Sequence, residues 1–209
     1  MDKIDLRKQF APLYKTGTKA KEPTLVEVPP MNFLMVDGQG DPNTSPQFKE
    51  AIETLYGLSY TLKFGSKMRK GIDWTVMALE CLWWADDPAA FHTGDKARWK
   101  WTLMIMQPDV VTPAAVEEAR EELRGRRRPA AIDRARLERF DEGLAAQVLH
   151  VGPYSEEGPT IERLHAFVEQ QGYELAGKHH EIYMSDPRRA KPETWKTILR
   201  YAVRKAGRK

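Results

Sequence analysis

The sequence predicts an α+β fold in which two similar halves each follow the order strand, helix, strand, strand. Two observations predict it: short apolar runs of strand length alternate with longer segments of helical period, and this order occurs twice in the 209 residues. Short identical sequences also recur at corresponding places, since Trp99-Lys100 and Trp195-Lys196 each open the final strand of a half. We therefore expect a pseudo-two-fold duplication with antiparallel sheets around a central cleft.

Two expected strands, 25–28 and 33–36, open the first half. Ser45-Pro46 is typical of a helix start, because a proline in the first turn gives up no helical hydrogen bond. An apolar stripe identifies the buried face of this helix: Phe48, Ile52, Leu55, Ser59 and Leu62. Strands at 74–84 and 99–106 complete the half.

The second half repeats this order. A strand at 145–151 precedes a helix at 159–171, which Gly172 ends as the residue after the helix. The inward residues of the helix are Ile161, Leu164, Phe167 and Val168. A strand around Glu181 and a last strand at 195–203 follow.

The expected domain organisation follows from these elements. Residues 1–23 are predicted to form a polar N-terminal arm, and residues 24–209 a single domain. Within that domain the repeats cover about residues 24–107 and 135–203, and a helical connection at 112–134 joins them.

Composition excludes several classes of protein. With 41% hydrophobic and 30% charged residues and a net charge of +3, nothing points to nucleic-acid or membrane attachment. The single cysteine, Cys81, excludes a disulfide framework and a cysteine zinc site. No apolar run approaches the roughly 20 residues of a membrane span, and the charged N-terminus is not a signal peptide. These features are typical of a cytoplasmic protein.

A carboxylate and two other polar side chains share one face of a short strand in the second half. In a period-two element His179, Glu181 and Tyr183 point one way and Ile182 the other. A Glu that faces an interior costs several kcal/mol unless it is paired. One interpretation is a strand-edge carboxylate satisfied by an Arg or by backbone N–H groups. The other is a carboxylate on a pocket floor that binds a cation or activates water.

The matching strand of the first half carries a second carboxylate. We align Glu80 with Glu181, which puts both at pseudo-equivalent positions facing one cleft, with Trp84 on the same face as Glu80. Two carboxylates that converge on an apolar cleft raise the pKa of at least one of them, which suits a general base.

Aromatic side chains could complete such a cleft. Tyr56 and Tyr60 lie one helical turn apart and could overhang it, and Trp101 could form a wall. Aromatic residues at these spacings are equally compatible with a plain hydrophobic core.

Two further patterns predict no site. His179 and His180 are adjacent on a strand and face opposite ways, so no metal site is expected. The run Arg124–Arg128 is short, follows an acidic helical turn and has no interleaved aromatic residue. It is therefore expected to be a solvated face rather than a nucleic-acid contact.

Three motifs together resemble the GyrI-like small-molecule-binding family, over about residues 24–203. They are His-His-Glu-Ile-Tyr-Met-Ser-Asp-Pro-Arg-Arg at 179–189, Gln-Val-Leu-His-Val-Gly-Pro-Tyr at 147–154 and Leu-Glu-Cys-Leu-Trp-Trp at 79–84. The resemblance implies the duplicated SHS2-type fold of multidrug-sensing effector domains and SOUL-type haem-binding proteins. It also implies that Glu181 meets a small aromatic or cationic hydrophobic ligand. The expected ligand-binding residues are Trp84, Trp101, Tyr56, Tyr60 and His179.

Some stand-alone members of this family are thought to hydrolyse cyclopropanoid DNA-alkylating natural products. The resemblance therefore implies a hydrolase without a cofactor, in which Glu181 is the base that deprotonates water. Tyr183 or another tyrosine of the cleft would donate a hydrogen bond to the dienone oxygen as it becomes phenolate, and Glu80 would be the supporting carboxylate.

The sequence is also compatible with two other functions. The protein could bind lipophilic cations without catalysis, as a sensor or a sequestering protein, or it could be a protein-interaction module like the gyrase inhibitor that gives the family its name. A carboxylate-bearing aromatic cleft favours hydrolysis or binding over the interaction module. A 23-residue polar arm is too short for a DNA-binding domain, so no direct nucleic-acid partner is expected.

Overall fold

The computed structural model describes residues 2–87, 94–126 and 129–207. The chain divides into two compact units. Unit 1 comprises Met1–Gln9 and Met31–Phe140, and unit 2 comprises Phe10–Pro30 and Asp141–Lys209. Each unit contains an antiparallel sheet and a helix packed against it, which confirms the predicted α+β class.

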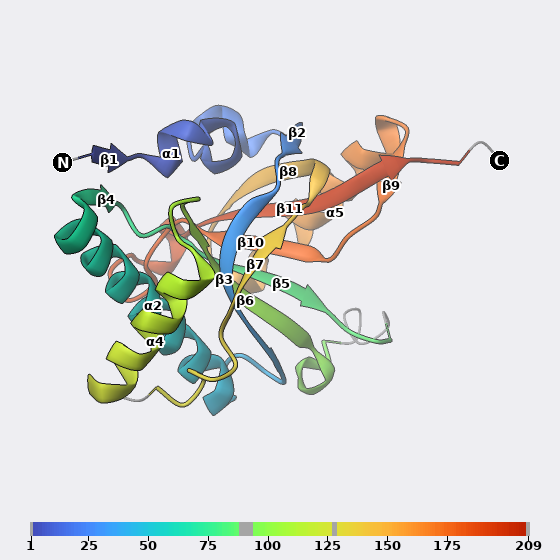
Figure 1. Cartoon of the computed structure of the whole chain (residues 1–209). Coiled ribbons are helices and arrows are strands. Elements are labelled where there is room, and N and C mark those ends of the chain that lie inside the picture. Colours follow the sequence, from blue (N-terminus) through green and yellow to red (C-terminus); the bar gives the residue numbers. More distant parts are fainter. Residues whose placement is uncertain (1, 88–93, 127–128, 208–209) are drawn as a thin grey trace. The chain divides into compact units, whose positions relative to one another are not determined.

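Unit 1 is built on a four-stranded antiparallel sheet. In sheet order its strands are β5 (Leu79–Trp84), β6 (Lys100–Gln107), β3 (Met31–Gln39) and β7 (Arg136–Phe140). The long helix α2 (Pro46–Lys70) packs on β3 and β6, and α4 (Pro113–Arg126) lies beside it (Figure 1). A short parallel pair, β1 (Asp2–Ile4) with β4 (Ile72–Trp74), and the short helices α1 (Leu6–Gln9) and η3 (Lys96–Arg98) complete this unit.

Unit 2 repeats this architecture. Its sheet order is β10 (His179–Tyr183), β11 (Lys196–Lys205), β8 (Gly143–Val151) and β2 (Thr24–Val28), with β9 (Tyr173–Leu175) paired to the end of β11. Helix α5 (Gly158–Gln170) packs on β8 and β9. The remaining elements are short 3₁₀ helices: η1 (Ala11–Tyr14), η2 (Thr18–Lys21), η4 (Tyr154–Glu156) and η5 (Pro192–Thr194).

The two units share their connectivity as well as their sheet order. The run β3, α2, β5, β6 in unit 1 corresponds to β8, α5, β10, β11 in unit 2. In both units a glycine with positive φ follows the first strand of the run and bonds to the tryptophan that precedes the last strand. Gly40 N donates to Trp99 O (2.8 Å), and Gly152 N donates to Trp195 O (3.0 Å). The repeated strand–helix–strand–strand order read from the sequence is therefore present in the backbone.

One strand belongs to a different sheet from the one we expected. Residues 24–28 were assigned to the first repeat, but β2 pairs with β8 of unit 2. The corresponding edge of unit 1 is filled by β7, which pairs with β3. The physical reason is Pro29-Pro30, since two consecutive prolines prevent a tight hairpin between β2 and β3 and allow the chain to change sheets.

The N-terminal residues, predicted to be a polar arm, contribute buried side chains to both units. Leu6 belongs to unit 1, and Leu13 and Tyr14 belong to unit 2; all three are buried. In the described part of the chain no helix combines the length and the apolar composition of a membrane span.

Candidate functional site

The carboxylate of Glu181 lies on β10 of unit 2 and is held by its two neighbours on the same strand face. Tyr183 Oη donates a hydrogen bond to Glu181 Oε2 (2.6 Å), and His179 Nε2 lies 3.0 Å from Glu181 Oε1. The side chains of His179 and Glu181 are only 10% and 14% exposed. The structure thus brings together three of the residues predicted from the strand alternation, His179, Glu181 and Tyr183.

Glu181 faces the helical side of its sheet. It pairs with Leu199 of β11, which packs with Leu164 and Val168 of α5 in the core of unit 2. Tyr201, two residues further along β11, lies between two imidazoles, with ring centroids 4.9 Å from His165 and 5.0 Å from His179. The carboxylate therefore sits where the sheet meets the helix.

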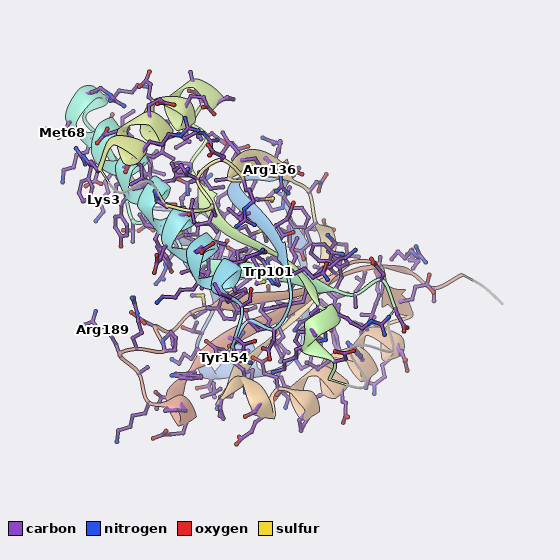
Figure 2. All side chains as sticks on the ribbon, turned by 90° about the horizontal axis from the view of Figure 1, so that it is seen from below. Lys3, Met68, Trp101, Arg136, Tyr154 and Arg189 are labelled. Carbon is purple, nitrogen blue, oxygen red and sulfur yellow. The ribbon has the colours of Figure 1, made fainter. Side chains whose placement is uncertain are left out.

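Aromatic rings form a wall beside this carboxylate. The Tyr154 ring, on η4, lies 5.7 Å from Tyr183 and 4.8 Å from Trp195. The indole N–H of Trp195 donates to Ala190 O (2.9 Å), which fixes the ring against the loop that follows β10. Tyr154 is 39% exposed, so a ligand can reach this wall from solvent. Tyr154 is the labelled aromatic near the start of α5 in Figure 2.

Sequence reasoning missed the fourth polar member of the cluster, Glu157. It occupies the N-cap position of α5, is 5% exposed and makes no side-chain capping hydrogen bond. Its Oε1 is buried without a hydrogen-bond partner among the described residues. The sequence Glu157-Gly158-Pro159 could have indicated this residue, because a proline in the first turn marks the start of a helix and Glu157 directly precedes that start.

The electrostatics of the cluster follow from burial and from the two carboxyls. Burial and then the charge of Glu181 raise the pKa of Glu157 to about 9, although the Thr197 hydroxyl opposes the shift. Burial, followed by the charges of Glu181, Glu157 and Asp186, raises the pKa of Tyr154 to about 12. The phenol of Tyr154 is thus a hydrogen-bond donor throughout the neutral range.

Burial also shifts the pKa of two neighbouring rings, Tyr201 and His165. Burial and then the same two glutamates raise the pKa of Tyr201. Burial lowers the pKa of His165, and the nearby His179 adds to this effect.

Glu157, His179 and Glu181 also bring metal-ligand atom types within 4.8 Å of one another. However, His179 Nε2 and both oxygens of Glu181 already hold hydrogen bonds inside the cluster. We therefore treat the three residues as a hydrogen-bonded carboxyl cluster.

The opposite face of β10 carries a separate buried network. His180 Nδ1 lies 3.0 Å from Glu142 Oε1, and Arg200 Nη1 donates to Glu142 Oε2 (3.3 Å). Arg200 also donates to Gln147 Oε1 (3.0 Å) and to Leu13 O (2.9 Å). His180 thus serves the packing of unit 2, on the side away from Glu181.

The predicted equivalence of Glu80 and Glu181 is wrong by one residue. Lys100 pairs with Trp84, whereas Lys196, its counterpart, lies opposite Met184. Counting back along each strand, the residue that matches Glu80 is His180. A shift of one residue moves a side chain to the other face of a strand.

The sheet faces on which Glu80 and Glu181 lie agree with this one-residue shift. Phe48 of α2 stacks on Trp83 (5.7 Å) and meets Trp101 edge-on (5.0 Å), so alternate residues of β5, including Trp83, face the helix. Glu80 is fully buried on the other face of its sheet, whereas Glu181 faces α5. The symmetry argument for a cleft shared by the two carboxylates therefore no longer holds.

The predicted aromatic residues of the first half all belong to unit 1. Trp101 has no exposed surface and lies within the side chains of the unit in Figure 2, so it is a core residue there. Tyr56 and Tyr60 stack on α2 at 6.4 Å, and Tyr60 is 46% exposed. Trp84 ends β5 and is partly buried. Their contact with a ligand stays a prediction.

Two arginines of the run 124–128, Arg124 and Arg126, form ion pairs. Arg124 pairs with Glu121 and Asp133, and Arg126 pairs with Glu122 (2.9 Å). Residues 127 and 128 lie outside the described part of the chain. The visible arginines thus lie on a face where acidic partners balance them.

The chain is similar to a known protein family and to several solved structures. A family model described as "GyrI-like small molecule binding domain" matches residues 21–204. A crystal structure of an uncharacterized conserved protein from Listeria innocua is 41% identical, with a TM-score of 0.88, covering 96% of this chain and all of the other. A hydrolase encoded by lin2189 from Listeria innocua is 40% identical, with a TM-score of 0.87, covering 97% of this chain and all of the other.

A more distant structure shows the fold alone. The EcmrR C-terminal domain is 14% identical, with a TM-score of 0.55, covering 88% of this chain and 98% of the other. None of the curated proteins compared with the chain matches it.

Proposed function

Because this chain belongs to the GyrI-like small molecule binding domain family, we propose that the Glu181 site of unit 2 binds flat hydrophobic molecules and hydrolyses cyclopropanoid electrophiles among them. The observation that carries the proposal is a carboxylate held by Tyr183 and His179 beside a partly exposed aromatic wall. The 40% identity to two Listeria innocua proteins described as hydrolases supports an enzymatic activity.

Glu181 is the proposed base. The hydrogen bonds from Tyr183 and His179 favour its ionised form and fix its orientation, which a base needs in order to act on a bound water. The rings of Tyr154 and Trp195 would hold a planar substrate by stacking, so that the strained carbon stays next to that water.

In the proposed reaction water opens the three-membered ring of a spirocyclopropyl cyclohexadienone. The water oxygen forms a bond to the cyclopropane CH₂, the spiro C–C bond breaks, and its electron pair turns the dienone into a phenolate. Glu181 takes the proton that the water loses. It then releases this proton to solvent, and the phenolate takes one up, so that the products are a phenol and a primary alcohol in one molecule.

The hydrogen-bond donor for the developing phenolate is assigned differently from the sequence-based expectation. The hydroxyl of Tyr183 already donates to Glu181, so its role is to orient the base. Tyr154 is the proposed donor, because its raised pKa keeps the phenol protonated and its ring borders the same wall. Glu157 takes the role of second carboxyl that we had expected for Glu80.

The experiment is turnover of a spirocyclopropyl cyclohexadienone in ¹⁸O-labelled water, followed by mass spectrometry. We expect a ring-opened product that carries one ¹⁸O atom, and loss of the enzymatic rate in Glu181→Gln. Glu156→Gln is the matched control, because Glu156 is an exposed neighbour of Glu157. Turnover that is absent, or that survives Glu181→Gln undiminished, would refute the catalytic proposal.

One observation favours a second function. Two adjacent carboxyls beside aromatic rings also suit a flat organic cation, which would bind without being converted. Tight binding of planar cations that depends on Glu181, in a protein with no turnover, would establish this binding function instead.

A further inference from the structure

Glu157 is a buried carboxyl whose protonation state the proposed mechanism does not define. It stands at the N-terminus of α5, but its side chain does not cap the helix. Since a helix N-terminus normally favours a carboxylate that accepts its N–H groups, the burial of Glu157 away from that role requires another explanation. Its position close to Glu181 provides one.

The two carboxyls differ in their hydrogen bonds. Glu181 accepts from the hydroxyl of Tyr183 (2.6 Å) and has His179 Nε2 at 3.0 Å, so each of its oxygens has a polar partner. Glu157 Oε1 has none among the residues described. Hydrogen bonds from donors stabilise a carboxylate, and burial without them favours the neutral acid.

We infer that Glu157 and Glu181 form a carboxylic acid–carboxylate pair that holds one proton at neutral pH, with the proton on Glu157 and the negative charge on Glu181. The inference rests on the proposed function and deepens it. Glu157 is then a positioning residue that sets the charge state of the base, and the pair carries one negative charge instead of two.

The surroundings of Glu157 support this assignment. From β10 it faces Glu181 and His179, and from β11 it faces Thr197 and Tyr201. From η4 it faces Tyr154, whose pKa responds to its charge. No permanently charged cation occurs in this set, and burial together with Glu181 raises the pKa of Glu157 to about 9.

The shared proton has a consequence for the reaction. If both carboxyls were ionised, the second buried negative charge would disfavour the phenolate that forms nearby. With Glu157 neutral, Glu181 stays free to take the proton of the attacking water. Glu157 keeps its own proton throughout, so the balance of the reaction is unchanged.

The test is thermal unfolding of the whole chain between pH 5 and pH 9, for the wild type and for Glu157→Gln. A carboxyl whose pKa is raised in the folded state contributes stability that is complete below its ordinary pKa. That stability is lost as the pH rises toward the folded value, because folding must take up a proton. Glutamine mimics the protonated acid and removes this loss. We therefore expect the Tm of Glu157→Gln to match the wild type near pH 5 and to exceed it increasingly toward pH 9.

Two variants make the test specific. Glu181→Gln removes the charge that faces Glu157, so it should also flatten the decline of Tm with pH; this arm stands even if Glu157→Gln does not fold. Glu156→Gln should follow the wild type at every pH. Wild-type and Glu157→Gln curves that run parallel from pH 5 to pH 9 would overturn the inference.

A kinetic comparison separates the inference from the proposed function. With the dienone as substrate, turnover by the wild type should fall as the pH rises toward 9, because ionised Glu157 adds a second negative charge beside the forming phenolate. Glu157→Gln should lack this fall, whereas Glu181→Gln should lose turnover at every pH. A fall toward pH 9 that persists in Glu157→Gln would overturn the assignment. If neither the wild type nor Glu157→Gln turned over the dienone, the proposed function would fail, but the unfolding curves would still decide the pairing.

Discussion

The hydroxyl of Tyr183 donates a 2.6 Å hydrogen bond to the carboxylate of Glu181, two residues earlier on the same strand. Strand alternation puts both side chains on one face, and the sheet faces α5 on that side. The contact is local in sequence, because the two residues are separated by one position on β10. In the proposed reaction this hydrogen bond orients the base.

Tyr183→Phe tests the role of the hydrogen bond from Tyr183 to Glu181. The variant keeps the ring and its contact with Tyr154 but loses the donor, so the ionised form of Glu181 is less favoured. We expect turnover to fall by about tenfold, and the pH at which activity is lost on acidification to rise. The measurement is the pH dependence of kcat, with Tyr173→Phe on β9 as the control. An unchanged profile in Tyr183→Phe would exclude the orienting role.

The aromatic wall makes a prediction about ligand binding. Tyr154→Ala removes the ring that lies against Trp195, and Tyr154→Phe keeps it. By calorimetry with a planar aromatic ligand, Tyr154→Ala should bind about fivefold more weakly, since a stacked ring contributes roughly 1 kcal/mol. Tyr154→Phe should bind like the wild type but turn over more slowly, because only the hydroxyl is lost. Equal affinity in the alanine variant would place the ligand elsewhere.

The buried network behind β10 predicts a dependence of stability on pH. Burial opposes the charge of Glu142, but His180 and Arg200 outweigh it and lower the pKa of Glu142 to about 2. The resulting stability is present above the ordinary carboxyl pKa and is lost as the pH falls toward 2. Glu142→Gln should lower the free energy of unfolding by about 3 kcal/mol at pH 7.

Urea unfolding at a series of pH values measures this difference. The gap between the wild type and Glu142→Gln should shrink as the pH falls below about 4.5, where the wild-type carboxylate begins to lose its advantage. Glu174→Gln, at an exposed ion pair with Arg204, is a suitable control and should change stability little. A gap that stays constant down to pH 3 would contradict the account of this network.

A side chain at position 38 of β3 is expected to clash with the ring of Trp101. A Cβ at this position would lie 2.1 Å from Trp101, whose ring is fully buried against Phe48 and cannot move aside. Gly38→Ala should therefore destabilise the protein by about 1–3 kcal/mol, as overpacked cores do. Gly17→Ala, where a Cβ meets nothing within 4 Å, should be close to neutral. Thermal unfolding of the two variants, compared with the wild type, tests this difference.

Much of the fold could be predicted from the sequence because its signals are local. Ser45-Pro46 started α2 as expected, and period-two alternation put His179, Glu181 and Tyr183 on one face. The errors concern features that depend on pairing between strands far apart in the sequence, namely which sheet a strand joins and which way its side chains face. Pairing with β8 rather than β3 took β2 into unit 2, and the register of β5 against β6 moved Glu80 to the other face of its sheet.

The missing member of the site has the same explanation. Glu157 precedes Ile161, the first expected core position of α5, and nothing in its local sequence shows that the helix end meets β10. Tyr154 and Trp195 likewise become neighbours only through the folding of η4 against the loop before β11. Local patterns therefore identified one strand of the site, and tertiary contacts supplied the rest.

A crystal structure of Glu181→Gln with a bound planar spirocyclopropyl dienone is the most direct test of the central claim, which is that unit 2 carries the site. We predict ligand density stacked against Tyr154 and Trp195, with the cyclopropane carbon next to the substituted side chain at position 181. Density confined to the exposed Tyr56–Tyr60 face of α2, or to any place away from position 181, would contradict the account.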